Sequence, residues 1–125
     1  MDDMTFNEKC VQCDGKNQNM QRFMEICLLV LLYNKPSHGY SLAEKLGEYG
    51  FLNLNVSTLY RTLRKMEKDT WVNSTWEQSG KGPKRRVYVI TKTGKQELNV
   101  LIKVLELRKS RIEKILNQYE KSIKE

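Results

Sequence analysis

The spacing of apolar residues in the last third of the chain constrains the fold most. These positions follow alternating steps of three and four residues: Leu98, Leu101, Leu105, Arg108, Ile112, Ile115, Tyr119 and Ser122. Such steps place side chains on one side of an α-helix, in the register of a coiled coil. We therefore predict a helix to about residue 122, with Arg108 interrupting its apolar stripe. Because a lone helix cannot bury this stripe, we expect it to pack on a second copy, or to fold back onto residues 20–33.

Residues 20–33 form a second predicted helix, apolar on nearly every side. A helix of this kind is buried on more than one face, so one face fits its own domain and another a partner subunit. Phe23 therefore joins the predicted dimer contacts, which are Leu98, Leu101, Leu105, Ile112, Ile115 and Tyr119. The polar residues 1–19 show no periodicity and are expected to form a flexible tail.

Two shorter helices are predicted between these long ones. The first carries apolar residues at helical spacing and stops at Gly50, and the second follows Ser57 as its N-cap. Their inward-facing positions are Leu42, Ala43, Leu46 and Tyr49 in the first helix and Leu59, Leu63 and Met66 in the second.

After Asp69 the pattern changes to strands. Residues 71–76 and 85–90 are rich in β-branched and aromatic residues, with the turn sequence SGKGPK between them at 79–84. We interpret Trp71 and Trp76 as core of this hairpin, the alternative being the lining of a ligand pocket. Thr93 with Gln96 forms a capping box for the last helix, with Thr91 as the alternative cap.

The fold class predicted from these elements is mainly α with a small β-hairpin. Residues 1–19 are the Cys-containing tail, 20–91 a winged-helix DNA-binding domain, and 92–125 a C-terminal dimerisation helix.

Positive charge is concentrated in the middle of the chain. Residues 57–95 hold ten Lys and Arg against three Asp and Glu, which equals the net charge of +7 for the whole chain. A concentrated basic patch attracts polyanions, so double-stranded DNA is the predicted partner, and a solvated basic surface is the alternative.

The candidate DNA contacts come from this region and from the turn before the first short helix. The outer side of the second short helix carries hydroxyls, an aromatic ring and two guanidiniums, groups suited to phosphates and base edges. These recognition-helix residues are Ser57, Thr58, Tyr60, Arg61 and Arg64. The candidate wing and backbone contacts are Ser37, His38, Tyr40, Lys81, Lys84, Arg85 and Arg86.

Three segments resemble the PadR family of transcriptional regulators: PSHGY at residues 36–40, VSTLYRTL at 56–63, and GPKRRVYVIT at 82–91, followed by Gly94. The resemblance covers about residues 23–105. It implies a winged helix-turn-helix with a C-terminal dimerisation helix, and repression of nearby genes that a small molecule or stress signal relieves. The single last helix is similar to the short-tailed branch. The Cys-containing leader before PSHGY is similar to polyhydroxybutyrate-responsive repressors.

One position departs from the family pattern. Relatives usually place Gly between the recognition helix and the first wing strand, where this chain has Thr70. Because a β-branched residue tolerates positive φ poorly, we expect Asp69 to adopt the left-handed turn, or the helix to end differently.

The remaining residues do not predict an enzyme, a cofactor or a metal site. Cys10 and Cys13 have metal or redox spacing, but four zinc ligands would require Cys27, His38 or a second subunit. We interpret Cys27 as a small core residue and His38, the sole histidine, as a cap or phosphate contact. With no leader or membrane-length apolar run, we expect a cytoplasmic, nucleoid-associated bacterial protein. The alternatives are a protein-interaction module and a thiol- or metal-responsive sensor.

Overall fold

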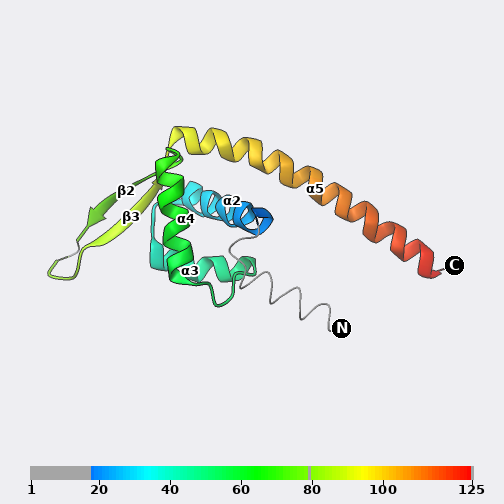
Figure 1. Cartoon of the computed structure of the whole chain (residues 1–125), viewed down its shortest axis with the longest axis horizontal. Helices are drawn as coiled ribbons and strands as arrows, with labels where there is room; N and C mark the ends of the chain where they lie inside the picture. The colour runs from blue at the N-terminus through cyan, green and yellow to red at the C-terminus, as the bar shows by residue number, and fades with distance from the viewer. Residues whose placement is uncertain (1–17, 79, 125) are drawn as a thin grey trace.

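A computed structural model describes residues 18–78 and 80–124 of the chain (Figure 1). Along the chain its elements are α2 (Gln18–Asn34), β1 (Ser37–His38), α3 (Gly39–Leu46), the 3₁₀ helix η1 (Gly47–Tyr49), α4 (Val56–Lys68), β2 (Val72–Glu77), β3 (Arg85–Ile90) and α5 (Lys92–Lys124). The predicted fold class, mainly α with a small hairpin and a long last helix, is confirmed. The expected tail, with Cys10 and Cys13, lies outside the described residues except for its last two positions.

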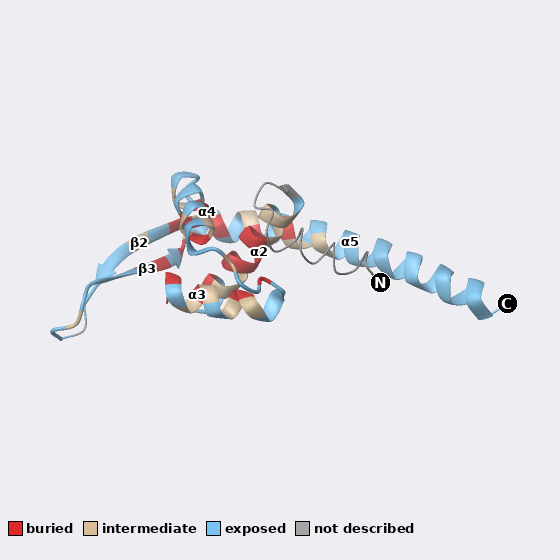
Figure 2. Ribbon diagram, turned by 60° about the horizontal axis from the view of Figure 1, so that its bottom comes forward, coloured by how far each residue is buried: buried red, intermediate tan, exposed pale blue. Residues whose placement is uncertain are grey.

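The sheet has one strand more than the predicted hairpin. Its order is β1-β3-β2, and both pairings are antiparallel. Ser37 pairs with Tyr88 at one edge, while Val72 pairs with Ile90 at the base of the hairpin. The base is buried and the tip is exposed, so the hairpin projects from the body of the molecule (Figures 1 and 2).

The core lies where α2, α3 and α4 meet the base of the hairpin. Its fully buried side chains include Leu28, Leu29, Leu42, Leu46, Leu59, Leu63, Met66 and Val72. As predicted, α2 is buried over much of its circumference, from Met24 to Leu29. Cys27 is buried in this core, and its removal from water raises the pKa of the thiol to about 11. At neutral pH it is therefore an unreactive thiol, in agreement with its interpretation as a core residue.

Two predicted helix caps are wrong by a few residues. The N-cap of α4 is Asn55, not Ser57: its side-chain oxygen accepts a hydrogen bond from the Ser57 backbone N–H at 2.8 Å. At the start of α5 the cap is Thr91, whose hydroxyl accepts from the Gly94 N–H at 2.9 Å. Thr93 is therefore not the N-cap, and the alternative proposed from sequence holds.

The turn after α4 also differs from the prediction. Thr70 itself adopts the left-handed conformation, with φ of 66°, while Asp69 has φ of −79°. The Thr70 N–H donates to the Glu67 carbonyl at 3.0 Å and the Trp71 N–H to the Met66 carbonyl at 2.9 Å. These two bonds form a Schellman motif, which satisfies the last carbonyls of the helix and holds a β-branched residue where glycine is usual.

Helix α5 divides into a packed half and a projecting half. Leu98 and Leu101 are only 7 % and 8 % exposed, because the start of α5 packs on α2 within the same chain. Beyond Leu105 the helix leaves the body, and every described side chain is exposed (Figures 1 and 2). In the described residues, no helix is long and apolar enough to cross a membrane.

Candidate nucleic-acid interface

A groove of about 670 Å³ lies between the start of α3, one side of α4 and the hairpin. Its lining consists of His38, Gly39, Tyr40, Tyr60, Arg64, Trp76, Lys84, Arg85, Arg86 and Tyr88. Four of these side chains are cationic, and none of the described residues that line the groove is acidic. Converging cations without a carboxylate create a positive potential, which favours a polyanion over a neutral ligand.

The wall of the groove formed by α4 is held in place by contact with α3. The Tyr60 ring lies directly against Gly39, so closely that a Cβ on Gly39 would collide with the ring. A side chain at position 39 would therefore displace the Tyr60 ring from its place against α3. Tyr60 is consequently half-buried, whereas Arg61 and Arg64 remain exposed on the same helix.

The floor of the groove is the buried face of β3. Tyr88 is a fully buried side chain at the centre of the sheet. Burial raises the pKa of its hydroxyl above the usual value, while the neighbouring Arg86 guanidinium opposes the shift. Tyr88 therefore remains a neutral hydrogen-bonding group at neutral pH.

The wing carries an aromatic side chain that was predicted to lie in the core. Trp76 is 62 % exposed, and Arg86, its cross-strand partner, lies 5.0 Å from its ring centre in cation–π contact. The core interpretation is therefore wrong for Trp76, which lines the groove. It holds for Trp71, which is partly buried and packs against the core.

The three predicted contacts at residues 37–40, in β1 and at the start of α3, lie in different environments. Ser37 is buried, and its hydroxyl donates to the Lys35 carbonyl at 3.2 Å, so it stabilises the turn instead of facing outward. His38 is the N-cap residue of α3 but makes no side-chain cap bond. Its Nδ1 is buried and has no hydrogen-bond partner among residues 18–78 and 80–124, and its Nε2 is 3.9 Å from Glu77. Tyr40 is 77 % exposed beside the groove.

The other predicted contacts are on the surface. Ser57, Arg61 and Arg64 are exposed on α4, and Thr58 is half-buried. The cations of the wing are all exposed: Lys81, Lys84, Arg85 and Arg86. The structure brings Arg64 to the same groove as the last three of these, although they are about twenty residues apart in the sequence.

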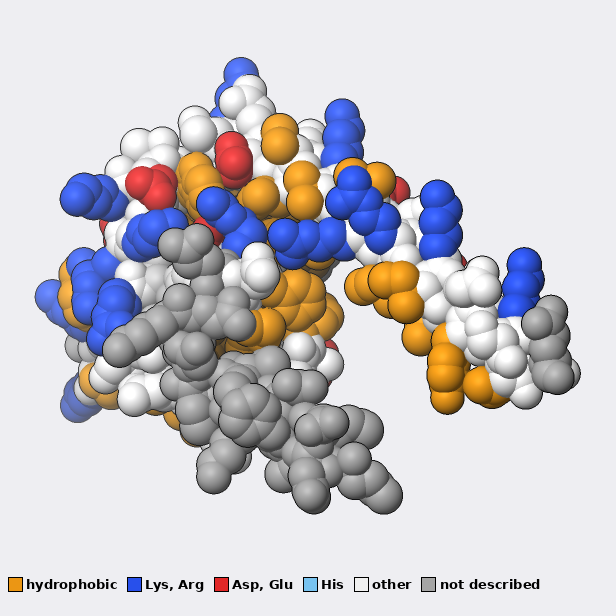
Figure 3. Space-filling model, turned by 45° about the vertical axis from the view of Figure 1, so that its right-hand side comes forward, with side chains coloured by type: hydrophobic (Ala, Val, Ile, Leu, Met, Phe, Trp, Pro, Cys, Tyr) orange, Lys and Arg blue, Asp and Glu red, His pale blue; other side chains and the backbone are white. Residues whose placement is uncertain are grey.

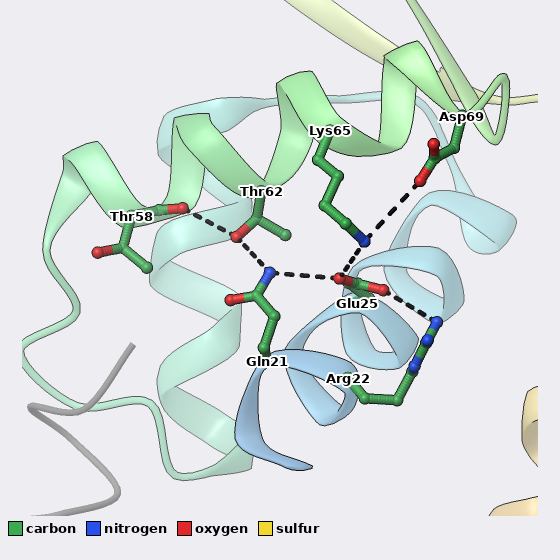
Figure 4. A network of polar contacts seen from close by, with 7 residues as sticks. All are labelled: Gln21, Arg22, Glu25, Thr58, Thr62, Lys65 and Asp69. Carbon is green, nitrogen blue, oxygen red and sulfur yellow. Dashed lines mark hydrogen bonds and ion pairs between the residues drawn. The ribbon is translucent and has the colours of Figure 1, made fainter. Parts of the chain in front are cut away.

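Sequence reasoning missed a polar network on the opposite side of α4 (Figure 4). Its centre is Glu25 of α2, whose side chain is only 2 % exposed. The carboxylate accepts from Lys65 of α4 at 3.1 Å, and from Arg22 and Gln21 of α2 at 3.3 Å each. Lys65 also lies 3.8 Å from Asp69.

The network continues along α4 through two hydroxyl-bearing residues. Gln21 donates to the hydroxyl of Thr62 at 3.0 Å, and Thr62 donates to the Thr58 carbonyl at 2.9 Å. The sequence carried one signal for this arrangement, a carboxylate at position 25 directly before the apolar run of residues 26–33 and four residues after Gln21. A buried carboxylate requires cationic or hydrogen-bonding partners, so it pins α2 to α4.

The predicted dimer contacts divide in the same way as α5. Leu98 and Leu101 lie in the core of their own chain, which corrects their placement on a surface open to a partner. Phe23 stacks on Phe51, with ring centres 5.9 Å apart, and is also directed inward. By contrast Ile112, Ile115 and Tyr119 are exposed. Figure 3 shows hydrophobic side chains gathered on one side of the projecting helix and Lys and Arg on the other.

Residues 18–78 and 80–124 contain no group of three His, Cys, Asp or Glu side chains that could hold a metal ion. Cys10 and Cys13, the weak metal candidates, are outside these residues, and Cys27 is buried without a disulfide partner among them.

Comparison with known proteins gives a consistent picture. The profile of the transcriptional regulator PadR-like family matches residues 28–100. The Mycobacterium tuberculosis protein named "Probable transcriptional regulator Rv1176c" is 36 % identical over 73 residues, which are 57 % of this chain and 39 % of that protein. The chain thus spans well under half of this relative.

Solved structures are similar over more of the chain. A PadR-like transcriptional regulator from Bacillus cereus is 27 % identical with a TM-score of 0.71, covering 80 % of this chain and 97 % of its own. A PadR-like transcription factor from Bacteroides fragilis is 26 % identical with a TM-score of 0.68, covering 80 % and 96 %. These relatives are named as regulators of transcription and not as enzymes.

Proposed function

The chain belongs to the PadR-like family of transcriptional regulators, and from this premise we propose that it binds double-stranded DNA through the groove between α4 and the hairpin. One observation carries the proposal: the described lining of this groove, beside the exposed side of α4, holds four cations and no carboxylate. A helix and a basic hairpin diverging from one body match a duplex, whose major groove admits the helix while the adjacent backbone meets the hairpin.

In this arrangement α4 reads bases and the hairpin fixes position. Arg61 and Arg64 are free to make bidentate bonds to guanine edges, because neither forms an ion pair with another described residue. Ser57, Thr58 and Tyr60 supply hydroxyls for phosphate or base contacts. Lys81, Lys84, Arg85 and Arg86 contact the backbone, and Gly80, with φ of 61°, forms the turn at the tip.

We also propose that the protein acts as a homodimer through the projecting half of α5. The exposed side chains of this half include Ile112, Ile115, Leu116, Tyr119 and Ile123, which together form an apolar stripe too large for a solvated monomer. Packing against the same stripe of a second copy buries it and places two α4 helices on one duplex, so the operator should be approximately palindromic.

The regulatory output we propose is repression released by a small-molecule or stress signal, as in the family. A gel-shift assay on the promoter of its own gene tests DNA binding. We expect a saturable shift on this duplex that weakens steeply as salt concentration rises, since counterions are released from the phosphates. Absence of a shift at low salt would contradict the proposal and favour a protein-interaction module.

A further inference from the structure

A second, polar hollow of about 420 Å³ lies on the far side of α4 from the groove, where α2, α4 and α5 meet. Its lining is Asn19, Gln21, Arg22, Glu25, Lys65 and Arg108. The volume is within the range of small-molecule sites, and the described residues that line the hollow include no apolar side chain.

The charges that line this hollow are unbalanced. Among the described lining residues three are cations, whereas Glu25 is the one carboxylate, and its two oxygens already accept from Arg22, Lys65 and Gln21. Arg108 is exposed and forms no ion pair with any residue that the structure describes. It also occupies a position of the α5 stripe where the heptad pattern calls for an apolar residue. Neither packing nor ion pairing within the described chain accounts for Arg108.

We propose that this hollow binds a small oxyanion, the carboxylate or phosphate group of a metabolite, with Arg108 as its main ligand. A guanidinium presents a planar fork that matches both groups bidentately. The buried carboxylate of Glu25 keeps the anion on the outer side of the hollow, toward Arg108, while Lys65 and Arg22 contribute positive charge. The amide of Gln21 holds the wall in place, since its NH₂ group donates to Glu25 and to Thr62.

Binding at this site acts on α4 through Lys65. The Lys65 ammonium lies 3.1 Å from Glu25 and 3.8 Å from Asp69, so an added anion competes with both for the same charge. Any effect on DNA affinity rests on the proposed function, because it requires α4 to be the recognition helix. Binding of the anion itself does not.

Trp71 provides the measurement, since the Lys65 Nζ lies 5.8 Å from the centre of its ring. The chain has two tryptophans, so Trp76→Phe in the full-length protein leaves Trp71 as the sole reporter. Sodium phosphate and sodium succinate are titrated separately, with sodium chloride at matched ionic strength as the reference. We expect a saturable change in Trp71 fluorescence with at least one of the first two; which one responds identifies a phosphate or a carboxylate ligand.

Arg108→Gln should weaken this binding about tenfold or more, since it removes a charge-assisted pair. Arg111→Gln is the matched control: it is an exposed arginine on the same helix that does not line the hollow. No saturable change with either salt, or equal losses in the two variants, would overturn the site. DNA binding is measured on the parent chain, because Trp76 lines the DNA groove. Anion binding without any DNA binding by the parent chain would leave the site standing and remove the proposed function. DNA binding without anion binding would support the proposed function and overturn the anion site.

Discussion

The two sides of α4 differ in what they contact. Toward α2 the helix presents Leu59, Leu63 and Met66, all nearly inaccessible, together with the hydroxyl of Thr62 and the ammonium of Lys65 bonded to α2. Away from the core the same helix presents exposed side chains that form no ion pair with a described residue, among them Arg64, which lines the groove, and Arg61.

This difference separates stability from recognition within thirteen residues. Side chains on the α2 side have exchanged water for protein partners and contribute to the free energy of unfolding. Those on the hairpin side keep their hydration and hydrogen-bonding capacity for a ligand. A substitution on the α2 side should therefore lower the free energy of unfolding and leave the DNA affinity of the folded protein nearly constant. A substitution on the hairpin side should lower the DNA affinity and leave the free energy of unfolding nearly constant.

The largest effect is expected on the α2 side from Leu63→Ala. Leu63 is completely buried, so the change removes apolar contacts and leaves a cavity, lowering the free energy of unfolding by about 2–5 kcal/mol. Chemical denaturation followed by circular dichroism measures the loss. Arg61→Ala, on the same helix, is the control and should unfold within about 0.5 kcal/mol of the parent. Similar losses in both variants would contradict the division.

A smaller loss is expected from Glu25→Ala, which leaves Lys65, Arg22 and Gln21 without their shared acceptor. Because the two cations are half-exposed and regain water, the loss should be about 2 kcal/mol, below that for a fully buried pair. Glu25→Met, which fills the same space without a charge, should lose less in the same denaturation experiment. If Met costs as much as Ala, the lost charge pairing and not the lost volume accounts for the effect.

On the hairpin side, Arg64→Ala should reduce affinity for the preferred operator about tenfold, or 1.4 kcal/mol, through loss of a base contact. Affinity for an unrelated duplex should change much less, and the unfolding curve should not move. Fluorescence anisotropy with the two duplexes at one salt concentration measures both affinities. Lys68→Ala, an exposed α4 cation outside the groove, serves as the control.

The smallest effect is expected from Lys84→Ala in the wing. Loss of one phosphate contact should weaken binding to all duplexes alike and lower the slope of log affinity against log salt by about one. Repeating the anisotropy measurement at several salt concentrations gives this slope. A loss of discrimination as large as that of Arg64→Ala would contradict the separate roles of helix and wing.

Much of this division was predictable from the sequence, because it follows from the helical spacing of apolar residues and from the positions of the charged ones. Helical spacing identified Leu59, Leu63 and Met66 as inward-facing, and the same wheel assigned Arg61 and Arg64 to the other side. The hairpin followed from its turn residues. The short strand β1 was not predicted, because a two-residue strand has no periodicity.

What the sequence did not reveal depends on contacts between distant residues. Glu25 accepts a hydrogen bond from Lys65, forty residues away, and no local sequence pattern predicts this contact. The left-handed Thr70 opposes its own propensity and is held by the last carbonyls of α4. The sequence offered packing on a second copy or on residues 20–33 as alternatives for the whole α5 stripe. Because the spacing is the same throughout, it did not show that Leu98 and Leu101 pack on α2 while the later positions are exposed.

The contacts between the hairpin and the start of α5 fix the direction in which this helix leaves the body. The Thr91 hydroxyl donates to the carbonyls of Thr70 and Trp71 while it caps Gly94, and no Cβ fits between Gly94 and the Trp71 carbonyl. The start of α5 is therefore held rigidly against the hairpin, and the helix continues without a break to Lys124. One residue inserted beyond Leu105 would rotate the far half of α5 by about 100° about the helix axis relative to the winged-helix domain. Seven inserted residues would restore the original rotation to within about 20°. In the proposed dimer, the length and helical phase of α5, more than any single contact along it, would set the angle between the two winged-helix domains on one duplex.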